Sequence, residues 1–255
     1  MISVGIDVGS ITAKAAVVRD GKVIAAKLIL TGYNARYAGE SVFESIMKET
    51  GINPSLVAKI IATGYGRNSV RIADKAITEI TCHAAGARYL NPEVRSVIDI
   101  GGQDSKAIAL DENGNVKDFA MNDKCAAGTG RFLEVMAKAL EVDLDNFGSF
   151  SLSADQPSKI SSLCTVFAES EVISLISKGE KRENIIAGIH ESIAVRVVAM
   201  ANRTGLKPPI MMTGGVAKNI GVVKALEKKI GRQIEVSPQS QLTGAIGAAL
   251  LAQRP

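Results

Sequence analysis

The sequence predicts an α/β protein made of two similar lobes around a cleft. Two observations carry this prediction: a segment near the start recurs later in the chain, and strand patterns alternate with helix patterns. The first copy reads V-G-I-D-V-G-S-I-T-A-K-A-A-V at 4–17, and the second reads I-D-I-G-G-Q-D-S-K-A-I-A at 98–109. The aspartate, glycine and lysine of the repeat are shifted by 92 positions, pairing Asp7, Gly9 and Lys14 with Asp99, Gly101 and Lys106.

Each copy of the repeat runs into a β-hairpin signal. Asp20-Gly21 separates the apolar runs 15–18 and 23–29, and Asn113-Gly114 separates 107–110 from 116–119. Asp-Gly and Asn-Gly favour tight hairpin turns because both residues tolerate positive φ angles. The two copies are therefore expected to begin two similar sheets.

Helical periodicity fills the intervals between the strands. Helices are expected at 40–49, 77–90, 131–140, 166–177, 184–203, 219–229 and 242–252. Further strands are expected at 59–62, 210–213 and 234–236. The segment 146–162 has no clear period and is predicted to be an irregular loop. We expect a first lobe at 1–95, with the C-terminal helix in 241–255 packing back on it, and a second lobe at 96–240.

Composition narrows the class of protein. With 255 residues, of which 46% are hydrophobic, the chain is long enough for a large buried core. The net charge is only +4, the charges of both signs are scattered, and aromatic residues make up 4%, which disfavours a nucleic-acid partner. The N-terminus lacks a basic leader, and no uninterrupted apolar run reaches about 18 residues. We therefore expect a cytoplasmic protein with no membrane partner.

The two repeat copies are candidate phosphate-binding loops. A strand that ends in Asp-x-Gly and turns sharply back points backbone N–H groups at an anion, since glycine allows a close approach. Mg²⁺ bound to ATP keeps most of its waters, so Asp7 and Asp99, with Asp104 third, are plausible ligands through water. The remaining candidates from the two loops are Gly9, Ser10, Thr12 and Lys14 on one side and Gly101, Gly102, Gln103 and Asp104 on the other. Gln103 and Asp104 are expected to position or activate the attacking water.

A third glycine element, M-M-T-G-G-V-A-K-N at 211–219, follows a predicted strand and opens a predicted helix. Through Gly214, Gly215 and Lys218 it suits adenosine and its α-phosphate at a helix N-terminus. The alternative is that each glycine pair is only a tight strand-to-helix turn, and three such elements in order weaken that alternative. A Walker G-x-x-x-x-G-K-[ST] and a Rossmann G-x-G-x-x-G are both missing.

The motifs G-I-D-V-G-S, D-I-G-G-Q-D and T-G-G-V-A-K-N resemble the two phosphate motifs and the adenosine motif of the actin, hexokinase and sugar-kinase superfamily. That resemblance implies two ribonuclease-H-like lobes around an ATP cleft.

Three cysteines, Cys82, Cys125 and Cys164, form an odd set without a C-x-x-C. One chain cannot build a four-thiolate site, whereas two copies related by a two-fold axis can. Cys125 and Cys164 each precede a helical pattern, so both are expected at helix N-termini, where the dipole lowers a thiol pKa and favours an anionic cluster. On this reasoning alone, inert core thiols remain the leading alternative.

Several other polar residues are expected to have structural roles. Cys82 lies in a helical pattern of small residues and is expected in the core. His83 and His190 have no ligand spacing around them and are expected on the surface or as satisfied core residues. Arg67 and Arg131 lie beside glycine loops, where contact with phosphate or a partner and ordinary ion pairing are both open.

N-D-K-C-A-A-G-T-G-R-F, C-T-V-F-A-E-S-E-V-I-S and A-T-G-Y-G-R-N at 62–68 closely resemble the activator component of 2-hydroxyacyl-CoA dehydratases. The wider BadF/BadG/BcrA/BcrD-type ATPase family includes subunits of benzoyl-CoA reductase and activators of double-cubane-cluster proteins. The likeness runs from about residue 5 to 251. It implies that Cys125 and Cys164 of two subunits bind one 4Fe-4S cluster, and Gly128 and Thr129 of the same motif join the cofactor-binding candidates.

The resemblance also implies a homodimer that binds ATP or ADP with Mg²⁺. Reduced ferredoxin or flavodoxin would supply an electron, and ATP binding would present the cluster to the partner enzyme. Two rival interpretations stay open: a small sugar or acid kinase using the same ATP site, and a non-enzymatic ATP-dependent scaffold with actin-like assembly. The sequence does not identify the partner, its substrate or the donor.

Overall fold

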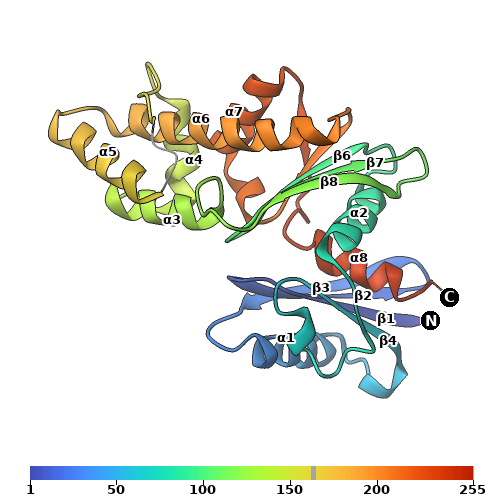
Figure 1. Ribbon diagram of the computed structural model, residues 1–255. Helices are drawn as coiled ribbons and strands as arrows, with labels where there is room; N and C mark the ends of the chain where they lie inside the picture. Colours follow the sequence, from blue (N-terminus) through green and yellow to red (C-terminus); the bar gives the residue numbers. More distant parts are fainter. Residues whose placement is uncertain (162–164, 255) are drawn as a thin grey trace. The chain divides into compact units, whose positions relative to one another are not determined.

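The computed structural model of the protein describes residues 1–161 and 165–254 (Figure 1). It divides into two compact units. Unit 1 comprises Met1–Val97, Leu110–Lys117 and Ser237–Pro255, and unit 2 comprises Ile98–Ala109 and Asp118–Val236. The described residues form two five-stranded sheets. The first sheet belongs to unit 1, and the second belongs to unit 2 except for a few end residues of its strands.

The sheet of unit 1 has the strand order β3-β2-β1-β4-β5. Its strands are β1 (Ile2–Val8), β2 (Thr12–Arg19), β3 (Lys22–Leu30), β4 (Val57–Thr63) and β5 (Lys75–Ala76). Neighbours β1 and β2, and β2 and β3, are antiparallel, whereas β4 runs parallel to β1 and β5 runs parallel to β4. The predicted turn joins β2 to β3 with Asp20 at φ 49° and Gly21 at φ 76°, which confirms the hairpin.

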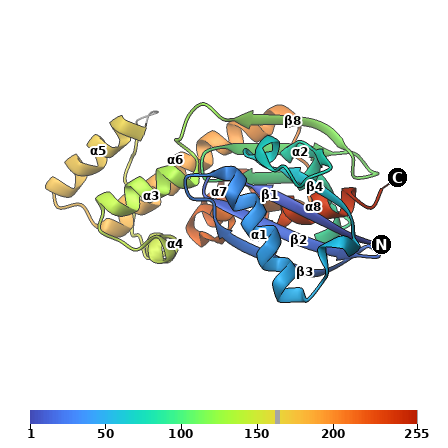
Figure 2. The ribbon, with the colours of Figure 1, turned by 90° about the horizontal axis from the view of Figure 1, so that it is seen from below.

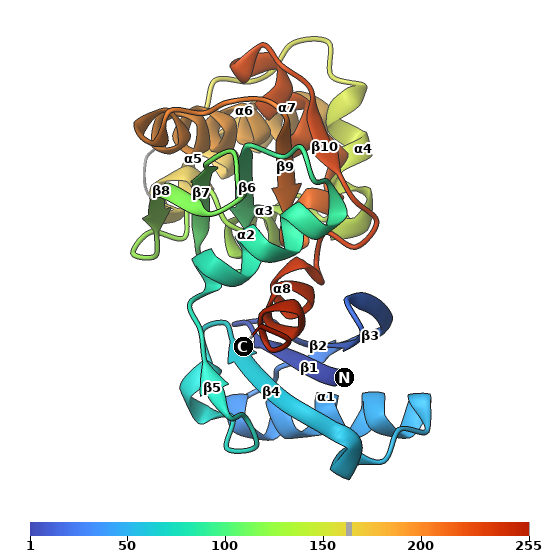
Figure 3. The ribbon, with the colours of Figure 1, turned by 90° about the vertical axis from the view of Figure 1, so that its right-hand side faces the viewer.

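Helices cover both faces of this sheet, as Figure 3 shows: α1 (Ala35–Thr50) lies on one side and α8 (Thr243–Leu251) on the other. The strands alternate to match. Ala15 and Val17 pack with α1, and Ala16 and Val18 pack with α8. A third helix, α2 (Glu79–Leu90), packs against α8. Short 3₁₀ turns, η1 (Pro54–Leu56) and η2 (Arg67–Ser69), flank β4.

Helix α1 begins five residues before the predicted start. Asn34 caps it, because its side-chain oxygen accepts a hydrogen bond from the Tyr37 N–H (3.1 Å), and Gly51 ends it at φ 66°. The apolar period alone does not show this first turn.

The sheet of unit 2 repeats the order of the first as β10-β9-β6-β7-β8. Its strands are β6 (Ser96–Ile100), β7 (Ser105–Leu110), β8 (Val116–Asn122), β9 (Ile210–Thr213) and β10 (Ile234–Val236). Each strand of unit 1 thus has a counterpart at the same place in unit 2. The repeat detected in the sequence is the most similar part of a duplication that extends through the whole sheet.

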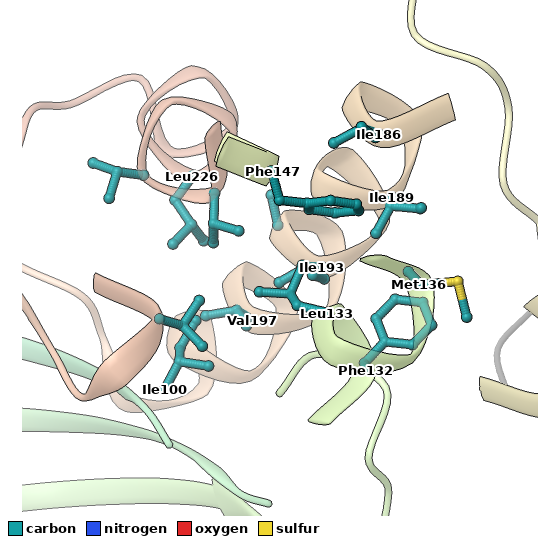
Figure 4. Close-up of a cluster of buried hydrophobic side chains, with 14 of the residues drawn as sticks. Ile100, Phe132, Leu133, Met136, Phe147, Ile186, Ile189, Ile193, Val197 and Leu226 are labelled. Atoms are coloured by element: carbon teal, nitrogen blue, oxygen red, sulfur yellow. The ribbon is translucent and has the colours of Figure 1, made fainter. Parts of the chain in front are cut away.

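Five helices of the described chain lie in unit 2: α3 (Gly130–Ala139), α4 (Leu144–Leu152), α5 (Thr165–Ser177), α6 (Arg182–Ala201) and α7 (Ile220–Ile230). The 3₁₀ turns η3 (Asn202–Thr204) and η4 (Gly215–Lys218) follow α6 and β9. Figure 2 shows α3, α4 and α5 gathered beside α6. The core between them contains Phe132, Met136, Phe147, Ile193 and Leu226, all at most 2% exposed (Figure 4).

Helix α4 corrects one prediction, because an irregular loop was expected at 146–162. Asp143 caps the helix, and Phe147 is fully buried among the side chains of α3, α6 and α7. Gly148 packs so closely on Asn219 that a Cβ would lie 2.7 Å from its side-chain oxygen. Serine and glycine have weak helix propensity, so packing rather than local preference forms this helix. The described residues after Ser153 contain no helix or strand up to α5.

Within the described residues, the segment Arg182–Thr204 is long and apolar enough to cross a membrane by length and composition alone. However, 72% of its apolar window is buried inside the protein. Helix α6 is the central core helix of unit 2, and Ile189, Ile193 and Val197 on it face the cluster in Figure 4.

Candidate functional site

The first glycine loop joins β1 to β2 in unit 1. Asp7 and Lys14 face each other across these antiparallel strands, and Lys14 Nζ lies 3.2 Å from Asp7 Oδ2. The turn between them closes with the Gly9 N–H donating to the Thr12 carbonyl (3.0 Å). Ser10 and Thr12 are half-buried beside it. Lys14, predicted to contact phosphate, is thus held as the partner of Asp7.

The second loop reproduces the same bonds in unit 2. Lys106 Nζ lies 3.2 Å from Asp99 Oδ2, and the Gly101 N–H donates to the Asp104 carbonyl (2.9 Å). The four residues are those of the first loop shifted by 92 positions. Among these four positions one differs in residue type, because Asp104 stands where the first copy has Thr12, and its carboxylate accepts from Lys106 at 2.7 Å.

The third glycine element joins the second loop directly. Thr213, the last residue of β9, donates its hydroxyl proton to Asp99 Oδ1 (2.9 Å). Asp99 is 2% exposed, and it accepts from Thr213 at Oδ1 and from Lys106 at Oδ2. Gly214 follows at φ 85°, and Gly215 and Lys218 are exposed on η4. Gln103 is exposed at the tip of the second loop.

Backbone hydrogen bonds tie the second loop to α3. The N–H groups of Gly130 and Arg131 donate to the carbonyls of Gly101 and Gly102, both at 2.9 Å. The first N–H groups of a helix have no acceptors within the helix, and the carbonyls of the glycine loop supply acceptors for two of them at the start of α3. Thr129 precedes them, fully buried, with its hydroxyl donating to the Ala126 carbonyl (2.6 Å). Any movement of the glycine loop therefore acts on the start of α3.

Cys125 lies in the loop between β8 and α3, five residues before the helix, so the expected position at a helix N-terminus is wrong. Asn122 holds this loop in place of a helix: its side-chain oxygen accepts from the Cys125 N–H (3.2 Å), and its amide donates to the Cys125 carbonyl (2.8 Å). The thiol is free and half-buried. Gly128 at φ 94° then turns the chain toward α3. Cys164 lies outside the described residues.

A cavity of about 350 Å³ opens beside Cys125 within unit 2. Asn122, Gly128, Met121, Arg196 and Arg203 are among its lining residues. A half-buried thiol next to open space and arginine side chains is suited to ligate an anionic iron-sulfur cluster. In the described part of the chain, no three metal-ligating side chains gather, so these residues of one copy do not form a complete metal site.

Cys82 differs from Cys125 in its burial and its position. It is fully buried on α2, and burial raises the pKa of its thiol to about 12, against a smaller lowering by the Thr63 hydroxyl. A neutral core thiol is not a cluster ligand, and the predicted core role of Cys82 is confirmed.

The two histidines are both buried. His83 is 5% exposed and interacts with another group of the protein, as the core alternative predicts. Its Nε2 and Asp7 Oδ2 each lie about 3 Å from the point where a Cβ on Gly244 would stand, so the two atoms are within about 6 Å of each other. Sequence reasoning missed this neighbourhood, since only the packing of α2 and α8 on β1 creates it.

His190 corrects the expectation of a surface or satisfied core residue. It is 1% exposed, neither ring nitrogen has a hydrogen-bond partner in the described structure, and its ring meets the edge of Phe147 at 5.5 Å. Burial lowers the pKa of His190 to about 3. It is a neutral ring packed in the core of unit 2.

Two five-stranded units of identical strand order, each with an Asp-x-Gly loop after its central strand, define an ATPase fold of the actin and hexokinase class. The sequence matches the profile of the BadF/BadG/BcrA/BcrD ATPase family over residues 4–252, and the chain belongs to that family. The predictions of the family, the two-lobed fold and the ATPase class are confirmed.

Known proteins extend this likeness over nearly the whole chain. The (R)-2-hydroxyglutaryl-CoA dehydratase activating ATPase of Acidaminococcus fermentans is 50% identical over 99% of this chain and 97% of its own length. A crystal structure of component A of the (R)-2-hydroxyglutaryl-CoA dehydratase of that organism superposes with a TM-score of 0.95 at 47% identity, covering 99% and 97% of the two chains. The activator of the 2-hydroxyisocaproyl-CoA dehydratase from Clostridium difficile, solved with bound ADPNP, gives 0.93 at 47% identity, covering 99% and 94%.

Proposed function

We propose that this protein is an ATP-hydrolysing activator that delivers one low-potential electron to a 2-hydroxyacyl-CoA dehydratase or a related metalloenzyme, such as a benzoyl-CoA-reductase-like or double-cubane-cluster protein. The observation that carries the proposal is the pair of backbone hydrogen bonds between Gly101-Gly102 and the start of α3. They connect a phosphate loop to the loop that holds Cys125. The names of the similar activators support the choice of partner.

The nucleotide would be held by the three glycine elements. Asp7 and Asp99, each with a lysine partner, would bind the waters of Mg²⁺. Gly9, Ser10, Thr12 and Lys14 from the first loop, and Gly101, Gly102, Gln103 and Asp104 from the second, would surround the phosphates. Gly214, Gly215 and Lys218 would hold adenosine. Gln103, which is exposed and next to Asp104, would orient the attacking water.

A homodimer would supply the metal site, with Cys125 and Cys164 from each copy as its four ligands. A 4Fe-4S cluster held there supplies a one-electron carrier, loaded from reduced ferredoxin or flavodoxin. Arg196 and Arg203 beside the cavity would favour the reduced, more negative state of such a group. Gly128 and Thr129 would set the path of the chain from Cys125 to α3.

Hydrolysis would be coupled to electron delivery through the link between the second loop and α3. ATP and ADP shift an equilibrium only if they bind its two states with different affinity, so the second loop must differ between them. Because its carbonyls accept from the Gly130 and Arg131 N–H groups, that difference reaches the Cys125 loop. Binding of the partner enzyme would then change nucleotide affinity by the same factor.

The functional lobes are proposed at 1–95, with the helix of 241–255, and at 96–240, in a cytoplasmic protein. The unit boundaries at Val97 and at Val236 support this division.

The test is the iron and sulfide content of protein purified without oxygen, for wild type, Cys125→Ser and Cys164→Ser. We expect about four irons per dimer in the wild type and loss of iron in either variant. Cys82→Ala is the matched control, because Cys82 is a neutral buried thiol, and it should keep full iron content.

Colourless wild-type protein, or a Cys125→Ser variant with unchanged iron, would contradict the proposed cluster. ATP turnover stimulated by a panel of sugars in iron-free protein would favour a small-molecule kinase. Nucleotide-dependent filaments would favour a scaffold.

A further inference from the structure

The loop A-T-G-Y-G-R-N at 62–68 has no role in the proposed function. It follows β4 in unit 1, and β4 lies beside β1 as β9 lies beside β6 in unit 2. Both strands end at a threonine that is followed by a glycine, Thr63-Gly64 and Thr213-Gly214, and both lead into a 3₁₀ turn. The loop is therefore the counterpart in unit 1 of the third glycine element.

Backbone geometry supports this equivalence. Gly64 has φ 90° and Gly214 has φ 85°. A Cβ on Gly64 would lie 2.5 Å from both the Val8 carbonyl oxygen and Asp7 Oδ1. A Cβ on Gly214 would lie 2.3 Å from the Ile100 carbonyl oxygen and 2.9 Å from Asp99 Oδ1. In both units, then, a glycine brings a loop into direct contact with the aspartate of the phosphate loop.

The two loops differ in the residues that follow the glycine. Tyr65 is 78% exposed, and the Gly66 N–H donates to the Val8 carbonyl (2.9 Å), which fixes the loop to the end of β1. Arg67 then turns back over the loop. Its backbone N–H and its Nη1 both donate to the Gly64 carbonyl, at 3.2 and 3.1 Å. The Arg67 guanidinium is thereby held at the loop that contacts Asp7.

This guanidinium carries an uncompensated charge. Arg67 is half-buried, and no carboxylate of the described residues forms an ion pair with it. Arg131 and Arg36, by contrast, pair with Glu134 at 2.8 Å and with Glu40 at 3.0 Å. One guanidinium N–H donates to the Gly64 carbonyl, so most of the N–H donors of Arg67 remain for an anion. The planar fork of arginine matches the oxygens of a phosphate group.

The site next to Arg67 is the phosphate loop of unit 1. The buried Cys82 thiol lies within electrostatic range of both Asp7 and Arg67, which places the two charges in one neighbourhood. Arg67 is a half-buried cation near Asp7, the carboxylate that would bind Mg²⁺. The phosphates of a bound nucleotide would supply the opposite charge.

We infer that Arg67 binds the terminal phosphate of ATP and stabilises the negative charge that develops there during hydrolysis. The inference rests on the proposed binding of Mg²⁺ and ATP at the Asp7 loop. In that reaction, a water oxygen forms a bond to the terminal phosphorus and the bond from that phosphorus to the bridging oxygen breaks. The bond's electrons stay on ADP, and both hydrogens of the water leave with inorganic phosphate. Arg67 takes no part in the proton transfer and only donates hydrogen bonds.

The experiment compares wild type, Arg67→Ala and Arg67→Lys in the full-length, iron-loaded protein. ATP turnover at saturation is measured together with the dissociation constants of ADP and of ADP with fluoroaluminate, which mimics the phosphate in transfer. Arg36→Ala is the matched control, because it removes an arginine of unit 1 that has its own carboxylate partner. Melting temperature and iron content show that each variant is folded and loaded.

For Arg67→Ala we expect kcat to fall by about 100-fold. Binding of ADP with fluoroaluminate should weaken by a similar factor, while ADP binding changes by less than about threefold. Arg67→Lys should recover only part of the loss, because lysine keeps the positive charge but lacks the planar fork of N–H donors. Arg36→Ala should behave as wild type.

A folded Arg67→Ala variant with kcat within about threefold of wild type would overturn the inference. Equal weakening of ADP binding and fluoroaluminate binding would also overturn it, because Arg67 would then contact the diphosphate. Neither result touches the proposed function, which would instead fail if the wild type itself bound no iron or hydrolysed no ATP.

Discussion

At the scale of single residues, one Asp–Lys ion pair organises each of the two glycine loops. Lys106 is 1% exposed and Asp99 is 2% exposed, and their separation of 3.2 Å equals that of Lys14 and Asp7. A charge so far from water is tolerated only with a partner, and removing one member typically costs about 3–5 kcal/mol. The lysines of the repeat therefore hold the aspartate side chains in position.

His190 should make the stability of the protein depend on pH. Its pKa is about 3 when folded against an ordinary value of 6.5, because burial disfavours the charged ring. The unfolded chain binds the proton more tightly, so this residue lowers stability as the pH falls from about 6.5 toward 3. At pH 5 the loss relative to pH 7 is about 2 kcal/mol.

Chemical denaturation of wild type and His190→Leu at pH 7 and pH 5 measures this effect. The wild type should lose about 2 kcal/mol more than the variant between the two pH values. Parallel losses in both proteins would show that His190 finds a proton-accepting partner or water in the folded state.

Residue types were easier to predict than their partners. Asp7, Asp99 and Cys125 could be selected from motifs, because glycine and cysteine patterns are local. That Lys14 pairs with Asp7 depends on strand register, and that His83 lies near Asp7 depends on helix packing. The turn in which Asn122 holds Cys125 is local, because the two residues lie three positions apart, and the sequence analysis missed it.

At the scale of elements, the glycines that end β4 and β9 fix the loops on the two aspartates. Each combines a positive φ with a contact that leaves no room for a Cβ. The strand-ending Thr-Gly pair is thus the structural unit that the duplication preserves, while the following residues have diverged.

Gly64→Ala and Gly214→Ala should both lower stability and abolish most ATP turnover. The positive φ alone costs about 1–3 kcal/mol, and the methyl group would also displace the aspartate or the adjoining carbonyl. Gly51→Ala and Gly205→Ala are matched controls, with φ of 66° and 70° and open space around the position of a Cβ. Thermal melting and ATP turnover of the four variants provide the test, and equal effects in loops and controls would contradict the account.

Most elements could be predicted from periodicity and turn residues, and each predicted helix has an observed counterpart with ends that differ by a few residues. The exceptions are informative. Helix α4 depends on the burial of Phe147 and on the close contact of Gly148 with Asn219, both of which involve distant parts of the chain. Because serine and glycine favour helices only weakly, the local sequence pattern does not predict α4.

The whole molecule combines a duplicated ATPase fold with a cysteine loop that only unit 2 carries. The duplication could be recognised because the two loops kept the same aspartate, glycine and lysine at one spacing. The sequence also showed that Cys125 and Cys164 belong to one half of the chain, whereas Cys82 belongs to the other. It could not show that the second glycine loop and the start of α3 share hydrogen bonds, since Gly101 and Gly130 are brought together only by the fold.

That shared contact makes the central claim testable without any partner enzyme. The measurement is the rate at which an iron chelator removes iron from the anaerobically purified protein in the presence of ADP or of ATP with Mg²⁺. If the state of the second glycine loop is transmitted to the Cys125 loop, the two rates should differ by about tenfold, which corresponds to a difference of about 1.4 kcal/mol in the activation free energy of iron removal. Equal rates with both nucleotides, in protein that hydrolyses ATP, would contradict the account.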